Sequence, residues 1–257
     1  MSWSKHRIFL IVFILLFSVE LFAFSQGIIC IKPLLLSLFL YSILLALASY
    51  FVGMRFYIPM INHLPNTYKG QKYIVLTFDD GPNPNSTKAL LELLERHEVK
   101  ANFFLIGKHI EEHADLAKEL HTRGHLLGNH SYSHTGFFPI SSTKKLRREI
   151  EKTNKLLEAI SLKKNTYFRP PFGVTNPLIA KVVKDLNMKT IGWSLRSYDT
   201  VKSKTQLIQK LKSNLRDGDI VLMHDIESSL DVVEKFIEYA KENGYQFVLL
   251  SEFFEKK

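Results

Sequence analysis

The stretch that decides the fold is Tyr73–Pro82, with the sequence YIVLTFDDGP. Its first six residues form an unbroken, β-prone run, typical of a buried parallel strand, and the Gly-Pro pair ends that strand abruptly. Asp79 and Asp80 therefore stand at the carboxyl end of the strand, where α/β sheets and barrels bind ligands. Two carboxylates this close repel each other, which favours a site shared with a cation. An isolated Asp-Asp pair more often supplies a helix cap and a turn residue, so the rest of the chain must distinguish the two interpretations.

Apolar runs of the same kind recur along the chain and alternate with segments of helical periodicity. Strands are expected at 73–78, 102–106, 126–128, 166–168, 189–193, 220–223 and 246–249. Helices are expected at 86–96, 108–122, 143–160, 176–186, 204–215 and 230–243. Repeated βα units predict a parallel sheet. The expected fold class is α/β, a distorted (β/α) barrel of about seven parallel strands.

The first 55 residues differ sharply from the rest. Ile8–Phe24 and Leu34–Met54 are apolar runs whose lengths suit a hydrocarbon core of ~30 Å. We favour a transmembrane helical hairpin that turns within Ser25–Pro33. The first run also resembles a signal sequence, because basic residues precede it and a small-residue site follows it.

The expected organisation is a membrane anchor over residues 1–55, a linker over 56–71 that lies on the membrane surface, and an α/β domain over 72–257. Two spans place both chain ends on one side of the membrane. The charge distribution weakly favours the cytoplasm for that side, since three of the flanking basic residues lie there and one lies opposite: Lys5, Arg7 and Arg55, against Lys32.

Composition narrows the choice of partners. The net charge of +9 suits nucleic acid, anionic lipid or an acidic polymer. The chain has no basic stripe interleaved with aromatic residues and no zinc-finger or helix-turn-helix pattern, so nucleic acid is not an expected partner. Cys30 is the only cysteine, which excludes an intramolecular disulfide.

A pair of histidines follows the strand expected at 126–128. His130–His134 has the sequence HSYSH, and this spacing within one helical turn would put both imidazoles on the same side. Two imidazoles and one carboxylate match a catalytic zinc site with an open position. His109–His113 has the same spacing but lies inside an expected outer helix, where His113 falls on the apolar face as a buried histidine. The two pairs differ in position, because only His130–His134 directly follows the end of an expected strand.

Two further segments follow strand ends. Arg169–Gly173 reads RPPFG; its two prolines stiffen the loop, and the arginine is able to bind a carboxylate. Taken alone, this segment is a structural turn. Ile220–Asp225 reads IVLMHD and places His224 at the end of another apolar strand. A lone histidine there is more often structural, but this one shares an edge of the sheet with the residues above.

In combination, these segments resemble the carbohydrate esterase family 4 polysaccharide deacetylases, which carry the NodB homology domain. The matching segments occur in the family's order: TFDDG at 77–81, the pair His130 and His134, RPPFG at 169–173, and LMH at 222–224. The resemblance does not touch residues 1–70. It implies that residues 72–257 form a catalytic domain, a metal-dependent hydrolase that removes N-acetyl groups from amino sugars.

The resemblance also assigns residues to roles. It implies a divalent metal, zinc in most relatives and cobalt or nickel in some, with the ligands Asp80, His130 and His134. The implied catalytic residues are Asp79, His224, Arg169 and Asp199. The implied substrate-binding residues are Pro171, Phe172, Trp193 and Leu222.

Each implied role suits the chemistry of its side chain. Asp79 would take a proton from metal-activated water, and Arg169 would hold Asp79 in place. His224 would protonate the departing amine, oriented by Asp199. A backbone N–H near Phe172 would bind the oxyanion, an interaction worth ~3 kcal/mol. Leu222 would line the pocket for the acetyl methyl group.

One family motif departs from its usual pattern. Residues 193–200 read WSLRSYDT, in which Trp193 and Asp199 are retained. Arg196 replaces an acidic residue of the family, and Thr200 replaces a tryptophan that lines the substrate groove. These changes predict a shifted substrate preference with the catalytic set intact.

Several alternatives share these residues. An O-acetyl esterase, or a deformylase acting on a lipid-linked sugar, would use the same set. A glycan-binding or assembly protein without turnover would be expected to lack a metal ligand or the base, and this chain has them all. The expected partners are an N-acetylated glycan or lipid-linked sugar, and membrane lipid. The expected location is a membrane, with the catalytic domain on the extracytoplasmic side by family resemblance.

Overall fold

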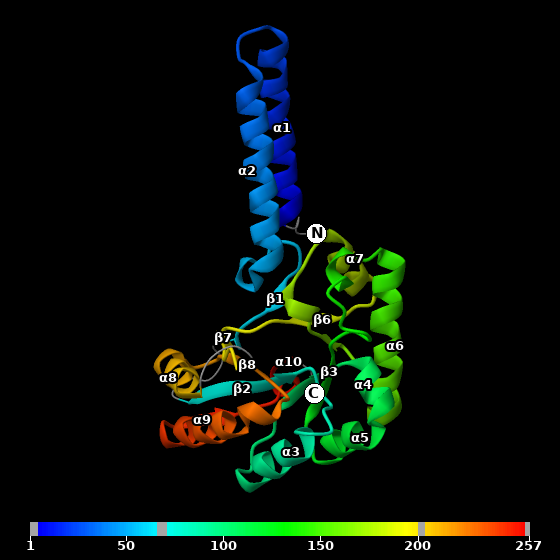
Figure 1. Cartoon of the computed structure of the whole chain (residues 1–257), viewed down its shortest axis with the longest axis vertical. Helices are drawn as coiled ribbons and strands as arrows, with labels where there is room; N and C mark the ends of the chain where they lie inside the picture. Colours follow the sequence, from blue (N-terminus) through cyan, green and yellow to red (C-terminus); the bar gives the residue numbers. More distant parts are fainter. Residues whose placement is uncertain (1–4, 66–70, 200–203, 255–257) are drawn as a thin grey trace.

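The structure is a computed structural model that describes residues 5–65, 71–199 and 204–254. Two long helices, α1 (Lys5–Ser25) and α2 (Ile31–Tyr50), form a hairpin that projects from an α/β domain (Figure 1). The foot of the hairpin is the end nearest the domain, and the turn between the helices lies at the far end.

The domain is built on a curled sheet whose ladders are all parallel among the described residues. Its strand order is β1-β6-β5-β4-β3-β2-β8-β7, and β9 pairs with the start of β2. The strands are β1 (Met60–Ile61), β2 (Lys72–Asp79), β3 (Asn102–Leu105), β4 (Leu126–Asn129), β5 (Tyr167–Phe168), β6 (Lys189–Ile191), β7 (Leu195–Arg196), β8 (Ile220–His224) and β9 (Tyr245–Phe247). The predicted distorted α/β barrel is therefore confirmed, with nine strands where about seven were expected.

Helices cover the outside of the sheet. They are α3 (Thr87–Arg96), α4 (Gly107–Glu112), α5 (Ala114–Thr122), α6 (Thr143–Ser161), α7 (Pro177–Asp185), α8 (Lys204–Asn214), α9 (Leu230–Glu242) and α10 (Leu250–Phe254). Short 3-10 turns lie at η1 (Val52–Met54), η2 (Phe138–Ile140), η3 (Pro171–Gly173) and η4 (Glu227–Ser229). The single helix expected at 108–122 is broken at His113, whose backbone leaves the helical region (φ −136°, ψ 53°).

The largest hydrophobic core forms where the apolar faces of the outer helices pack against β2. Ile74, Leu76 and Phe78 are fully buried and pack with leucines of α3 and with Phe236 of α9. Helix starts agree with local chemistry: Asn176 accepts hydrogen bonds from the backbone N–H groups of Leu178 and Ile179, directly before a proline at the first helical position.

Residues 56–64, which we expected to be part of a linker, instead belong to the domain. Phe56–Ile58 are buried, and β1 pairs in register with β6. His63 forms an antiparallel bridge to Asp219, so this segment fills the gap between β6 and β8. The stretch was misassigned because two-residue strands carry no detectable periodicity. Residues 66–70 of the expected linker lie outside the described residues.

The hairpin matches its prediction in shape. Both helices are long and apolar enough to span a bilayer. In the most apolar 18-residue segment of each helix, 0% of α1 and 11% of α2 is buried inside the structure. Ser37 of α2 donates a hydrogen bond to the Glu20 carboxylate of α1 at 2.7 Å, so Glu20 faces the partner helix, where a carboxylate is less costly than against lipid.

A candidate metal centre at the carboxyl ends of the strands

Asp79 and Asp80 occupy the carboxyl end of β2, the central strand of the sheet. Asp79 is 4% exposed and lies in register with His224 at the end of β8, so these two residues end neighbouring strands. Asp80 adopts a left-handed backbone conformation (φ 70°), which costs a non-glycine residue energy. The turn after β2 thus departs from the strand geometry in which neighbouring side chains point to opposite faces.

Asp80, His130 and His134 form a cluster whose ligand atoms lie within 4.8 Å of one another. Asp80 Oδ1 is 3.6 Å from His130 Nε2 and 3.5 Å from His134 Nε2. That oxygen is buried and has no hydrogen-bond partner in the structure. A buried carboxylate oxygen without a donor is costly, and a divalent cation beside it would satisfy its lone pairs. The residues therefore fit a zinc-type site.

The protonation of the two imidazoles suits metal binding. His130 Nδ1 is 2.8 Å from the carbonyl oxygen of Arg169, which can only accept, so Nδ1 carries the proton and Nε2 presents a lone pair. Burial, together with the neighbouring His130, lowers the pKa of His134 to about 4. His134 is therefore neutral near pH 7, the form in which an imidazole coordinates metals.

The two histidines lie on a loop. The prediction that they share one turn of a helix was wrong. Ser131 and His134 have positive φ angles of 66° and 46°, which break any helix. Glu149 of α6 holds the loop: its carboxylate accepts hydrogen bonds from the backbone N–H of Ser133 at 2.8 Å and from the Ser133 hydroxyl at 2.9 Å. The histidines converge because α6 pins a tight loop.

A buried ion pair fixes Asp79. Arg169 is fully buried, and its Nη1 donates to Asp79 Oδ1 at 2.7 Å and to the Thr77 hydroxyl at 2.8 Å. Nη2 donates to the carbonyl oxygen of Gly192 at 2.9 Å, and the guanidinium lies over the ring of Phe104. The structure thus brings Arg169 and Asp79 together through one hydrogen bond, and the fixed guanidinium sets the direction of the carboxylate.

A second buried pair fixes His224. Both oxygens of Asp199 are used: Oδ1 lies 2.7 Å from His224 Nδ1, and Oδ2 accepts from the His224 backbone N–H at 2.7 Å. Burial alone would lower the pKa of His224, but the hydrogen bond and charge of Asp199, with the charges of Asp79 and Asp80, outweigh it and raise that pKa above its usual value. For Asp199 the balance runs the other way. Burial alone would raise its pKa, but the hydrogen bonds and charge of His224 outweigh burial and lower that pKa below its usual value.

The four residues expected to bind substrate are spread around this edge. Phe172 is 48% exposed, and its ring centroid lies 4.6 Å from that of His134. Pro171 and Leu222 are buried, so each offers little surface to a ligand. Trp193 is partly exposed with Arg169 beneath its ring at 5.9 Å. Thr200, the second motif departure, lies outside the described residues.

Arg196, the other departure, lies beside Trp193. Its guanidinium carbon is 5.6 Å from the centre of the Trp193 ring and 5.1 Å from that of Tyr198. Arg196 thus contacts two aromatic rings at the position where the family resemblance implies an acidic residue.

Two residues near the site were given no role from sequence. Asp225, 1% exposed, accepts hydrogen bonds from the hydroxyls of Ser86, at 2.7 Å, and Thr87. A Cβ on Gly81 would come within 2.7 Å of Asp225 Oδ2, so only glycine fits where this carboxylate backs the Asp80 turn. The sequence feature that could have identified Asp225 is its position, a charged residue directly after a buried strand.

The other is His109, from the second His-x-x-x-His pair. Its Nδ1 lies 2.8 Å from the carbonyl oxygen of Asp80, so it helps to hold the turn that carries a ligand. His113 is partly exposed, which corrects the expectation of a buried histidine. The reason is that α4 ends at Glu112 and the backbone turns His113 away from the expected apolar face.

Asp225→Ala is expected to lower the free energy of unfolding by about 2–4 kcal/mol, because the buried Thr87 hydroxyl loses its acceptor and the Ser86 hydroxyl keeps only the carbonyl oxygen of residue 225. Thermal unfolding of the full chain in detergent measures this. Asp231→Ala is the matched control: its carboxylate is 61% exposed and pairs with Lys204, so it should change stability little. Equal unfolding temperatures for the two variants would contradict the role given to Asp225.

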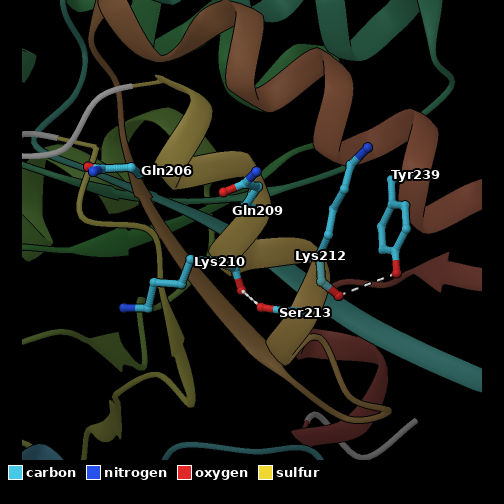
Figure 2. A pocket seen from close by; sticks show the side chains of 6 residues that line it. All are labelled: Gln206, Gln209, Lys210, Lys212, Ser213 and Tyr239. Carbon is cyan, nitrogen blue, oxygen red and sulfur yellow. Dashed lines mark hydrogen bonds between the residues drawn. The ribbon is translucent and has the colours of Figure 1, made fainter.

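A surface depression lies elsewhere, on helices α8 and α9 (Figure 2). It is lined by Gln206, Gln209, Lys210, Lys212, Ser213 and Tyr239. Within it, the Tyr239 hydroxyl donates a hydrogen bond to the Lys212 carbonyl oxygen at 3.3 Å. It holds neither a carboxylate nor an imidazole, so it offers none of the chemistry found at the strand ends.

Comparison with known proteins agrees with this geometry. The sequence model of the family described as polysaccharide deacetylase matches residues 66–191. A peptidoglycan-N-acetylglucosamine deacetylase of Bacillus cereus is 32% identical over 194 residues, which cover 73% of this chain and 90% of that protein. The enzyme PgdA of Listeria monocytogenes is 33% identical over 208 residues, 78% of this chain but only 43% of that longer protein.

Solved structures give the same fold. The peptidoglycan deacetylase PdaC of Bacillus subtilis has a TM-score of 0.67 and 30% identity, covering 73% of this chain and 92% of that one. A protein of Bacillus anthracis described as a CE4 family pseudoenzyme has a TM-score of 0.67 and 30% identity, covering 72% of this chain and 66% of that one. The neighbours therefore include a protein described as a deacetylase and one described as a pseudoenzyme.

Proposed function

Because the chain belongs to the polysaccharide deacetylase family, we propose that it is a metal-dependent hydrolase that removes N-acetyl groups from the amino sugars of a glycan or lipid-linked glycan. The observation that carries the proposal is the convergence of Asp80, His130 and His134 on one point beside a fixed, buried Asp79. A protein that only bound glycans would have no need of that carboxylate and its buried arginine.

Asp80, His130 and His134 would hold a divalent cation, and their donor set matches zinc, with cobalt or nickel as alternatives. When bound, the cation would supply Lewis-acid chemistry, which acidifies water and polarises an amide carbonyl. The chain's own residues then have to position the amide, accept one proton and donate another.

Asp79 is the base in this proposal. Its Oδ1 is held by Arg169, while its Oδ2 lies 3.7 Å from His130 Nε2 and therefore faces the metal ligands. A carboxylate fixed on one oxygen and free on the other is suited to take a proton from water at this point. A buried arginine that cannot move keeps the free oxygen directed there.

His224 is the acid. It stands opposite Asp79 on the neighbouring strand, with Nδ1 bound to Asp199 and Nε2 left to donate. An amine is a poor leaving group unless it is protonated as the bond breaks. The raised pKa of His224 keeps more of it protonated near neutral pH than an ordinary histidine. Phe172 and Trp193 would contact the sugar, whereas Pro171 and Leu222 expose little surface and would line only the base of the pocket for the acetyl group.

The pH dependence tests this assignment. His224 must be protonated to act, so kcat/KM should fall as pH rises through its pKa. Asp199→Asn removes the charge that raises this pKa and leaves burial, which lowers it. We expect the alkaline limb of the kcat/KM profile to move to lower pH. A limb that stays in place would show that another group is the acid.

The reaction itself is tested by acetate release. Purified full chain should release acetate from N-acetylglucosamine oligomers, lose that activity to a chelator and recover it with zinc. Parallel O-acetyl and N-formyl sugars distinguish an esterase or a deformylase. If the chain bound metal and sugar but released neither acetate nor formate from any of these substrates, it would be a glycan-binding protein without turnover.

We further propose that residues 1–55 anchor the catalytic domain, which includes residues 56–64 as well as 72–257, to the extracytoplasmic face of a membrane. The support is the apolar hairpin and the cell-wall substrates in the names of relatives. Accessibility of a cysteine introduced on the domain surface to an impermeant reagent in intact cells tests the side. Labelling only after permeabilisation would place the domain in the cytoplasm.

A further inference from the structure

The foot of the hairpin is packed onto the barrel domain. Ser49, at the end of α2, accepts a hydrogen bond from the backbone N–H of Thr175 at 3.0 Å, and the Tyr57 hydroxyl donates to the Leu45 carbonyl at 3.3 Å. Ala48 is 1% exposed and belongs to the same apolar cluster as Phe138 and Ile179 of the domain. The membrane end of the hairpin therefore meets the domain at a defined place, beside α7 (Figure 1).

That place adjoins the metal site. Thr175 lies three residues after Phe172, and three residues span at most ~11 Å. The ring of Phe172 in turn packs against the metal-ligand candidate His134. One short segment thus connects the foot of the hairpin with the edge of the site, so the mouth of the site lies near the membrane end of the molecule.

The surface around this segment is unusually apolar. Beyond Phe51, the described residues include five exposed large apolar side chains, and four of them lie here: Phe137 (70% exposed), Ile140 (78%), Phe172 (48%) and Leu178 (44%). We call these four residues the apolar rim. Phe137 follows His134 by three residues, and a hydrogen bond from Asn176 to the Pro139 carbonyl joins η2 to the start of α7. The fifth residue, Leu162, caps the opposite end of α6.

Basic side chains accompany the rim. The first turns of α6 and the outer face of α7 expose five basic residues: Lys144, Lys145, Arg148, Lys181 and Lys184. Of the acidic residues there, Glu151 and Asp185 are paired with Arg147, and Glu149 accepts hydrogen bonds from Ser133. Apolar side chains with exposed cations around them match the layer in which lipid headgroups meet acyl chains.

We propose that the apolar rim rests in the headgroup layer of the membrane that holds the hairpin, and that the substrate is an acetylated amino sugar attached to a membrane lipid. The substrate assignment rests on the proposed function, whereas the position of the rim does not. A site held at the bilayer surface meets a sugar carried by a lipid without removing it from the membrane, because the lipid tail stays beside the rim.

Contact with lipid is tested by fluorescence quenching. In a Cys30→Ser chain, Ile140→Cys and Leu162→Cys are each labelled with an environment-sensitive dye, and the full chain is placed in vesicles of phosphatidylethanolamine and phosphatidylglycerol. Lipids with a quencher near the headgroup should quench the dye at 140 at least about threefold more than at 162, which lies on the far side of the domain. Equal quenching at the two positions would overturn the proposal.

The substrate class is tested by rates on two probes. One is N-acetylglucosamine on a long alkyl chain within the vesicles, and the other is a soluble N-acetylglucosamine oligomer. The double variant Phe137→Ser and Ile140→Ser should lose about tenfold in rate on the alkyl probe and little on the soluble one, with Leu162→Ser as the control. Equal losses on both probes would overturn the lipid-linked assignment. Failure of the wild type on both would instead refute the proposed function, and the quenching result would stand.

Discussion

Replacing His134 with alanine is expected to remove the bound metal and to lower kcat/KM by at least about a thousandfold. His134 supplies one of the two imidazoles of the cluster, and its Nε2 lies 3.5 Å from the buried Asp80 oxygen that no donor satisfies. The remaining two ligands form an open site with a much lower affinity for zinc. Metal content per chain and acetate release after zinc loading measure the two effects together.

The chain contains its own control for this experiment. His113 belongs to the second His-x-x-x-His pair, with the same spacing, and is partly exposed away from the cluster. His113→Ala should therefore keep both metal and activity. If His113→Ala lost metal to the same degree as His134→Ala, the assignment of the ligands would be wrong.

Asp79→Asn is expected to lower kcat by about 10²–10⁴-fold while the metal content stays that of the wild type. The asparagine oxygen can still accept the hydrogen bond from Arg169 Nη1, but the amide cannot take a proton from water. Single-turnover rates with zinc-loaded protein measure the chemical step alone.

Stability has to be measured alongside, because Arg169 is fully buried and loses its counter-charge in this variant. Folded protein with bound metal and a wild-type rate would exclude Asp79 as the base. A variant that is folded, metal-bound and slow supports the role proposed for it.

Much of the fold was predictable because it follows from local patterns. The run Tyr73–Phe78 became the buried centre of the sheet, and alternating apolar runs and helical segments located six further strands. β1 and β7 were missed because each has two residues and forms through contacts with strands far away in the sequence. Phe56–Ile58 were placed in a linker because Pro59, Pro65 and Gly70 follow them, although their burial depends on the tertiary fold.

The members of the candidate site were predictable for a topological reason. Each follows an apolar run, and the ends of parallel strands meet at one edge of a sheet, which is how the structure arranges Asp79, His130, Arg169 and His224. The helical reason for the His130–His134 spacing was wrong, because positive φ angles make that segment a tight loop. Sequence patterns cannot show such angles, nor a contact such as that between His109 and the Asp80 carbonyl.

The proposal as a whole depends on one cation held by one carboxylate and two imidazoles. X-ray absorption at the zinc edge of the zinc-loaded full chain tests this most directly. The account predicts scattering from two histidine rings with Zn–N distances of about 2.0–2.1 Å and a further oxygen shell, with one ring lost in His130→Ala. A spectrum without histidine scattering, or one unchanged by His130→Ala, would contradict it.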